Sequence, residues 1–75
     1  MKPTNVTNRI RQLREAAGGV SQGELAEHVG VTRQTVNAIE RGKYSPSLEV
    51  AFRIARFFRV GLEDVFAYEE HHGPK

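Results

Sequence analysis

Apolar residues recur every three or four positions in five short stretches of this 75-residue chain. This interval predicts amphipathic helices, because it places the apolar side chains on one face of a helix. We expect helices from about Thr7 or Asn8 to Ala17, between Ser21 and Gly30, between Thr32 and Gly42, from Ser47 to about Phe58, and from Gly61 through Phe66. The predicted fold is therefore all-α, a compact bundle of five short helices.

Residues 20–42 carry the clearest local signals (VSQGELAEHVGVTRQTVNAIERG). Ser21 begins an S-x-x-E capping box, and Gly30 suits the left-handed residue that ends a helix. Thr32 suits the cap of a second helix, which closes at Gly42. Because only three residues separate the two helices, they must cross sharply, and this predicts a helix-turn-helix.

The second of these helices has a polar face that a hydrophobic core does not require. Arg33, Gln34 and Asn37 lie near its start. Arginine can form paired hydrogen bonds with guanine, and glutamine or asparagine with adenine, in the major groove of DNA. The alternative is an ordinary solvated helix face, but the position within a helix-turn-helix favours base reading.

Charge is distributed unevenly along the chain, although the net charge is only +2. Residues 1–59 hold ten Lys or Arg against five Asp or Glu, whereas residues 60–75 hold one against four. A basic body favours binding to a polyanion, and an acidic end would point away from it or contact a partner. Ordinary solubilising charge explains the same distribution, so charge alone leaves both interpretations open.

Length and composition define the class of protein. The chain is predicted to form one domain (1–75), with a core of about residues 8–67, a flexible N-terminal arm of residues 1–6 and a tail of residues 69–75. It contains no cysteine, which excludes disulfides and thiolate metal sites. Because it also lacks an apolar run long enough to span a bilayer, we expect a cytoplasmic protein with no membrane partner.

Residues 21–66 resemble the XRE/Cro family of phage-repressor-like regulators, whose pattern combines SQ-x-x-LA, GV-(S/T), E-x-G and P-(S/T)-L. The matching positions are Ser21, Gln22, Leu25, Ala26, Gly30, Val31, Thr32, Thr35, Val36, Ile39, Glu40, Gly42, Pro46, Ser47, Leu48, Ala51, Ile54 and Ala55. The resemblance implies a five-helix lambda-repressor-like domain. It also implies sequence-specific binding to double-stranded DNA and regulation of transcription, usually by a dimer.

The resemblance also implies roles for individual residues in DNA binding. The family docks its third helix in the major groove, which adds Thr35 to the candidate base-reading residues. The positions that correspond to phosphate contacts are Gln22, Arg41 and Lys43. Gln22 also fits a plain polar residue in the first turn of a helix, so its role stays open at this point.

An ion pair between Arg14 and Glu40 is a further implication of the resemblance. It would lock the third helix to the first. A partly buried pair would make the loss of one partner cost about 3–5 kcal/mol. An exposed pair would be worth only about 0–1 kcal/mol.

Apolar residues near the end of the chain exceed what a five-helix core needs. They predict a homodimer interface of Phe57, Leu62, Val65, Phe66 and Tyr68. The interface would involve the fifth helix and the residues just beyond it, and some short relatives extend this segment into a strand, here about residues 65–69. The alternative is that these side chains complete the core of a monomer.

A DNA-binding transcriptional regulator is the function that these features favour, and we expect a repressor that binds a palindromic operator. The alternative is an antitoxin-type protein that neutralises a partner and autoregulates its operon. We do not expect an enzyme, because no nucleophile and base form a recognisable constellation. His28 fits a surface position, and the adjacent His71 and His72 are weak metal ligands, so we expect neither a metal nor a cofactor.

Overall fold

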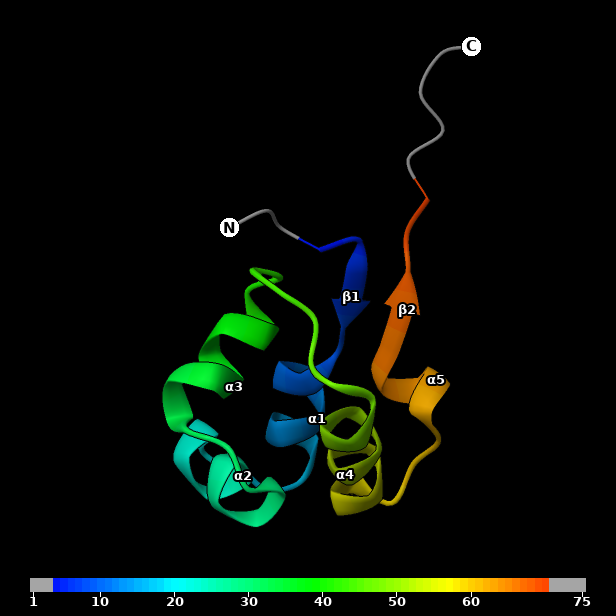
Figure 1. Ribbon diagram of the computed structural model, residues 1–75. Helices are drawn as coiled ribbons and strands as arrows, with labels where there is room; N and C mark the ends of the chain where they lie inside the picture. Colours follow the sequence, from blue (N-terminus) through cyan, green and yellow to red (C-terminus); the bar gives the residue numbers. More distant parts are fainter. Residues whose placement is uncertain (1–3, 71–75) are drawn as a thin grey trace, which may run out of the picture.

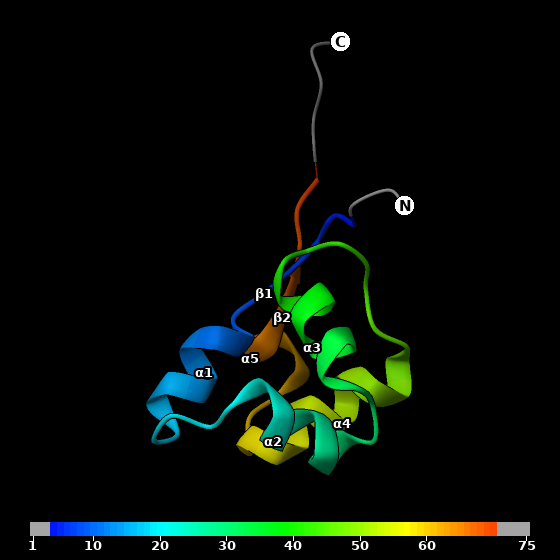
Figure 2. The same ribbon diagram turned by 90° about the vertical axis from the view of Figure 1, so that its left-hand side faces the viewer.

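Five helices and a two-stranded antiparallel sheet make up residues 4–70, the part of the chain that the computed structural model describes (Figure 1). In chain order the elements are β1 (Val6–Asn8), α1 (Ile10–Ala16), α2 (Gln22–Val29), α3 (Arg33–Glu40), α4 (Leu48–Phe58), α5 (Leu62–Val65) and β2 (Phe66–Tyr68). α2 packs against α3 and α4, and α5 contacts both α4 and β2. Figures 1 and 2 together place α2 and α3 on one side of the molecule and α5 with β2 on the other.

Three of the helices begin at the residues that the sequence predicts as caps. Ser21 Oγ accepts a hydrogen bond from Glu24 N, and Glu24 Oε1 accepts one from Ser21 N, so the capping box is complete. The side chains of Thr32 and Ser47 cap α3 and α4. Each cap satisfies a backbone N–H that the helix leaves free and is worth about 1 kcal/mol. The predicted helix-turn-helix is present as α2, a short turn and α3.

The sheet corrects the all-α prediction. β1 pairs with β2 in antiparallel register, with Val6 opposite Tyr68 and Asn8 opposite Phe66. Val6, the last residue of the predicted flexible arm, therefore lies in a strand, and the first helix begins at Ile10, after the strand. A three-residue strand is too short to show an alternating pattern, and the partner of β1 lies at the far end of the chain. The strand that the family resemblance allows after the fifth helix is present as β2.

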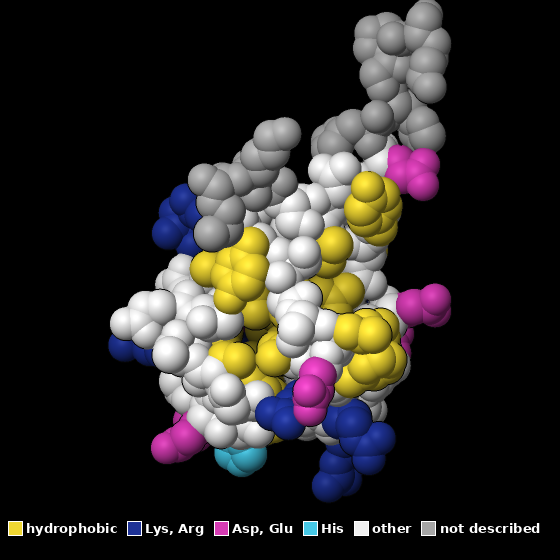
Figure 3. Space-filling view, viewed as in Figure 1, with side chains coloured by type: hydrophobic (Ala, Val, Ile, Leu, Met, Phe, Trp, Pro, Cys, Tyr) yellow, Lys and Arg dark blue, Asp and Glu magenta, His cyan; other side chains and the backbone are white. Residues whose placement is uncertain are grey.

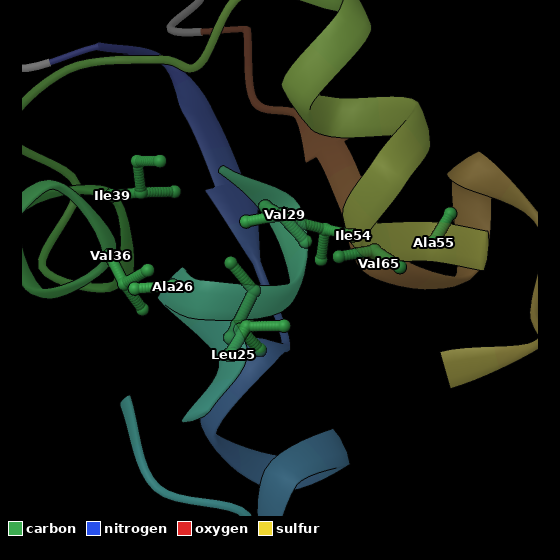
Figure 4. Packing of buried hydrophobic residues seen from close by; sticks show 9 residues of the cluster. Leu25, Ala26, Val29, Val36, Ile39, Ile54, Ala55 and Val65 are labelled. Atoms are coloured by element: carbon green, nitrogen blue, oxygen red, sulfur yellow. The ribbon is translucent and has the colours of Figure 1, made fainter. Parts of the chain in front are cut away.

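The hydrophobic core receives side chains from all five helices (Figure 4). Its buried members are Ile10, Leu25, Ala26, Val29, Val36, Ile39, Ile54, Ala55 and Val65. A fully buried aliphatic side chain contributes about 1.5–3 kcal/mol, so this single cluster holds the helix-turn-helix on the other elements. Within residues 4–70, no helix has both the length and the apolar character that crossing a bilayer requires.

The turn between α2 and α3 depends on Gly30. Its φ of +81° lies in the left-handed region, where a Cβ atom is unfavourable. A Cβ atom at this position would also lie 3.1 Å from Nη1 of Arg53 in α4. That nitrogen donates a hydrogen bond to the carbonyl oxygen of Val29, at 3.3 Å. A side chain at position 30 would therefore disturb both the turn and its contact with α4.

We expect Gly30→Ala to lower the free energy of unfolding by about 1–2 kcal/mol, because an L-residue is strained in the left-handed region. Gly23→Ala is the matched control, since Gly23 lies inside α2 and a Cβ there would meet no atom closer than 3.9 Å. Alanine in a helix is favoured over glycine, so the control should be neutral or stabilising by about 0.5–1 kcal/mol. Urea unfolding followed by circular dichroism measures the free energy of unfolding of both variants. Equal effects would contradict the inference that the turn at position 30 requires glycine.

Candidate nucleic-acid interface

The outer face of α3 carries an open groove of about 390 Å³. It is lined by Arg33, Gln34, Asn37, Ala38, Arg41 and Lys43. The structure thus brings the predicted base-reading residues Arg33, Gln34 and Asn37 together with two of the predicted phosphate contacts. Arg33 and Gln34 are exposed, whereas Asn37 is half-buried. We call this set of six residues the α3 groove.

The α3 groove carries three positive charges. Arg33, Arg41 and Lys43 are exposed, and none of them forms an ion pair with another residue of the described range 4–70. Lys and Arg side chains lie at the left edge of the space-filling view, where α3 is located (Figure 3). Three exposed cations that have no carboxylate partner in the described range favour the binding of an anionic ligand.

The start of α2 lies beside the α3 groove. A second hollow there is lined by Arg14, Ser21, Gln22, Gly23 and Arg33. Gln22 Nε2 donates a hydrogen bond to Glu40 Oε1 at 3.2 Å, and Asn37 Nδ2 donates one to Gln22 Oε1 at 3.4 Å. These bonds orient the predicted phosphate contact and a predicted base reader with respect to each other. The free N–H groups at the start of a helix also favour a phosphate in this position.

Thr35 is the predicted base reader that the structure does not bring into the α3 groove. Its hydroxyl lies 2.9 Å from that of Thr32, and its backbone N–H donates to the same Thr32 oxygen at 3.1 Å. Thr35 therefore belongs to the cap of α3, and sequence position alone does not distinguish this role from an outward-facing one.

The predicted ion pair between Arg14 and Glu40 is present and bidentate. Arg14 Nε and Nη2 donate to the two carboxylate oxygens of Glu40 at 2.7 and 3.1 Å. Arg14 Nη1 also donates to the carbonyl oxygen of Val20 at 2.9 Å. The two side chains are only 16% and 8% exposed, so the pair is largely buried. One guanidinium group thereby connects α1, the loop before α2 and the last turn of α3.

Hydrogen bonding to Glu40 raises the pKa of Arg14 above its ordinary value, although burial acts in the opposite direction. A cation whose pKa is raised by folding contributes its full stabilisation below the pKa of the unfolded chain. That contribution is lost as the pH rises through the still higher pKa of the folded state. The charge of Arg14 is therefore constant at neutral and acidic pH.

The predicted dimer residues separate into three groups. Leu62, Phe66 and Tyr68 line two adjoining apolar hollows beside the sheet. Val65 is 1% exposed and belongs to the core, so its predicted role in a dimer interface is wrong. Phe57 lies elsewhere, with its ring centroid 4.9 Å from that of His28. The apolar spacing of a short helix cannot show which of its residues faces inward.

Two residues of this apolar surface were not among the sequence candidates. Val6 lines both hollows, because β1 lies next to β2. Leu48 lines the larger one and is 68% exposed. Hydrophobic side chains are visible over β2, α4 and α5 in Figure 3. We call Val6, Leu48, Leu62, Phe66 and Tyr68 the apolar face.

Histidine and acidic residues do not form a metal site in the described part of the chain, residues 4–70. His28 lies on the surface of α2, and its Nδ1 is 3.0 Å from the carbonyl oxygen of Glu24. His71 and His72 lie outside the described residues.

A helix-turn-helix with a cationic, amide-bearing face on its second helix defines the class of DNA-binding helix-turn-helix proteins. Comparison with known proteins agrees, because the Helix-turn-helix family matches residues 10–65. The chain belongs to the XRE/Cro family of helix-turn-helix transcriptional regulators. Members of this family are DNA-binding regulators and not enzymes.

Individual relatives cover most of the chain. An uncharacterised HTH-type transcriptional regulator of Methanocaldococcus jannaschii is 51% identical over 84% of this chain and 94% of its own length. The transcriptional repressor RstR of the cryptic phage CTXphi, from Vibrio cholerae, is 33% identical over 85% of this chain and 57% of its own length. The crystal structure of the restriction-modification controller protein C.AhdI from Aeromonas hydrophila has a TM-score of 0.65 and 33% identity. It covers 73% of this chain and 82% of that one. The protein is thus a transcriptional regulator with a helix-turn-helix DNA-binding domain.

We expect Arg14→Ala and Glu40→Ala each to lower the free energy of unfolding by about 3–5 kcal/mol, because each leaves a buried charge without its partner. The double variant should lose less than the sum, with a coupling of about 1–3 kcal/mol. Denaturant unfolding of the four proteins measures this cycle.

The pair Arg53–Glu49 supplies the control for this cycle, since its side chains are 52% and 74% exposed. The same substitutions there should show a coupling of only about 0–1 kcal/mol. Equal coupling in the two cycles would mean that burial does not strengthen the Arg14–Glu40 pair.

Proposed function

We propose that the protein represses transcription by binding a palindromic operator as a homodimer, with α3 of each subunit in a major groove. The observation that carries this proposal is the α3 groove, in which three cations adjoin the amide groups of Gln34 and Asn37 and form no ion pair within residues 4–70. This arrangement of cationic and amide side chains is expected of a helix that lies in the major groove of DNA with its first turns facing the bases. The name of the related phage repressor supports the repressor assignment.

Base reading is assigned to Arg33, Gln34 and Asn37. Arg33 and Gln34 are exposed at the start of α3, so each can form two hydrogen bonds with the edge of one base. Asn37 lies one turn later, and its Nδ2 already donates to Gln22. We therefore expect Asn37 to contact a base through its Oδ1 atom. Thr35 receives no base contact in this proposal, because its hydroxyl is engaged in the cap of α3.

Phosphate contacts are assigned to both ends of the helix-turn-helix. Gln22 lies at the N-terminus of α2, where its amide and the free backbone N–H groups can bond one phosphate. Arg41 and Lys43 lie just after α3 and line the far end of its groove. Such contacts fix the position of α3 on the duplex without reading its sequence.

Dimerisation is assigned to the apolar face. Tyr68 is 65% exposed and Leu48 is 68% exposed, and both adjoin the half-buried Leu62 and Phe66. A contiguous apolar surface of this kind is typical of a subunit contact, and a two-fold axis would cover it with its own copy. Pairing about that axis would set the two reading helices about 34 Å apart, one turn of DNA.

We expect Gln34→Ala to relax base preference at one position in each half-site, because a paired contact with adenine discriminates by about 1–3 kcal/mol. Selection of binding sites from a random DNA library, with the purified wild type and variant, measures this preference.

Lys43→Ala is the control for this selection, because a phosphate contact carries no sequence information. It should weaken binding to all sites alike. The slope of the logarithm of affinity against the logarithm of salt concentration should fall by about one. An unchanged base preference in Gln34→Ala would remove Gln34 from the reading set.

We expect Tyr68→Glu to convert the dimer to a monomer at tens of micromolar, because a carboxylate would be buried in an apolar contact. Sedimentation equilibrium without DNA measures the mass. Phe52→Glu is the matched control, since Phe52 is 48% exposed on α4 but lines neither hollow of the apolar face. A wild-type protein that is monomeric under these conditions would refute the dimer.

A further inference from the structure

Asn8 joins three elements through one side-chain amide. Its Nδ2 donates a hydrogen bond to the carbonyl oxygen of Ile39, in the last turn of α3, at 2.8 Å. Its Oδ1 accepts one from the backbone N–H of Ile10, the first residue of α1, at 3.1 Å. Its own backbone lies in β1, opposite Phe66 of β2. The side chain is partly buried, so both bonds are shielded from water.

The bond to Ile39 fixes the C-terminal end of the reading helix. The Ile39 carbonyl also accepts a hydrogen bond from the backbone N–H of Gly42 at 3.0 Å, which closes the last turn locally. The bond from Asn8 is therefore a second one, and it ties this turn to a strand outside the helix. A second contact nearby supports the same attachment, because Thr4 N donates to the carbonyl oxygen of Gly42 at 3.3 Å. The segment around β1 is thus attached to the end of α3 by polar groups at two points.

The strand that pairs with β1 belongs to the apolar face. β1 pairs with β2, and β2 carries Phe66 and Tyr68 of that face. A continuous path therefore runs from the apolar face across the β1–β2 ladder to Asn8 and then to α3. Core contacts and the Arg14–Glu40 pair also hold α3, but they join it to other helices. The bond from Asn8 joins it to the sheet beside the apolar face.

We propose that Asn8 is a positioning residue that fixes the orientation of α3 relative to the dimer axis, and so determines which spacing of operator half-sites is accepted. This inference rests on the proposed function, because it requires a dimer that places two α3 helices on one duplex. Changing the spacing by one base pair shifts the half-sites by about 3.4 Å and rotates them around the duplex. A rigidly held α3 cannot follow that change, whereas a loosely held one can.

Asn8→Asp tests the proposal. Aspartate keeps the oxygen that accepts from Ile10 N–H, so the hydrogen bond to the first residue of α1 is retained. It has no N–H to donate to Ile39, and its negative charge is unfavourable near the C-terminus of α3. Thr7→Ala is the matched control, since Thr7 lies in the same strand, is exposed and has its side-chain bond only to Ala67 O, at 3.4 Å.

The experiment measures affinity for duplexes that carry the selected half-sites with the optimal spacer and with one base pair more or fewer. For the wild type and Thr7→Ala, the optimal spacer should be preferred strongly. For Asn8→Asp, that preference should fall by about two- to tenfold, the fold-change that corresponds to one hydrogen bond. Base preference within each half-site and dimer mass should not change. Thermal unfolding checks that the variant is folded.

The outcomes separate this inference from the proposed function. If the wild type discriminates between spacers and Asn8→Asp discriminates equally well, the role of Asn8 is refuted and the dimeric operator complex stands. If Asn8→Asp loses base preference together with spacing preference, Asn8 has a general structural role and the proposal is also refuted. If the wild type shows no spacing preference, the proposed dimeric binding fails and the inference fails with it.

Discussion

The buried ion pair of Arg14 and Glu40 is the interaction on which the DNA-reading surface depends. Both carboxylate oxygens of Glu40 are bonded to the guanidinium group, and one of them also accepts from Gln22. Gln22 in turn holds Asn37. A bidentate pair has a fixed geometry, so it determines where α3 lies relative to α1 and how two side chains at the surface are oriented. A substitution at Arg14 would therefore alter, through Glu40, the orientation of Gln22 and Asn37.

Two surfaces with different tasks share this small fold. The α3 groove is polar and cationic, and it lies on the side formed by α2 and α3. The apolar face lies on the side formed by α5 and the sheet. Within residues 4–70, the fully buried members of the core that separates them are aliphatic, and protein interiors are close-packed and stiff. A domain of this size can therefore hold the α3 groove and the apolar face at a defined distance from each other.

The parts of the structure that the sequence could predict are those with local causes. Ser21, Thr32 and Gly30 act within a few residues of themselves, so the helix-turn-helix and its outward residues are evident from their spacing. The sheet depends on contacts between the two ends of the chain and leaves no periodic signal. Whether Val65 or Leu62 faces inward is decided by how α5 lies on α4, and the hydrogen bond from Asn8 to α3 has no sequence signature at all.

The pairing of β1 with β2 has a consequence for the order in which the molecule assembles. Thr7 and Ala67 are 60 residues apart, so their strands can meet only after a large loop has closed. The contact between α2 and α3 closes a much shorter loop, and contacts of low sequence separation form early. On a ribosome, the segment with α2 and α3 leaves the exit tunnel before β2 does. Nascent chains should therefore form the helix-turn-helix first, while the apolar face, which includes residues of both strands, is completed last.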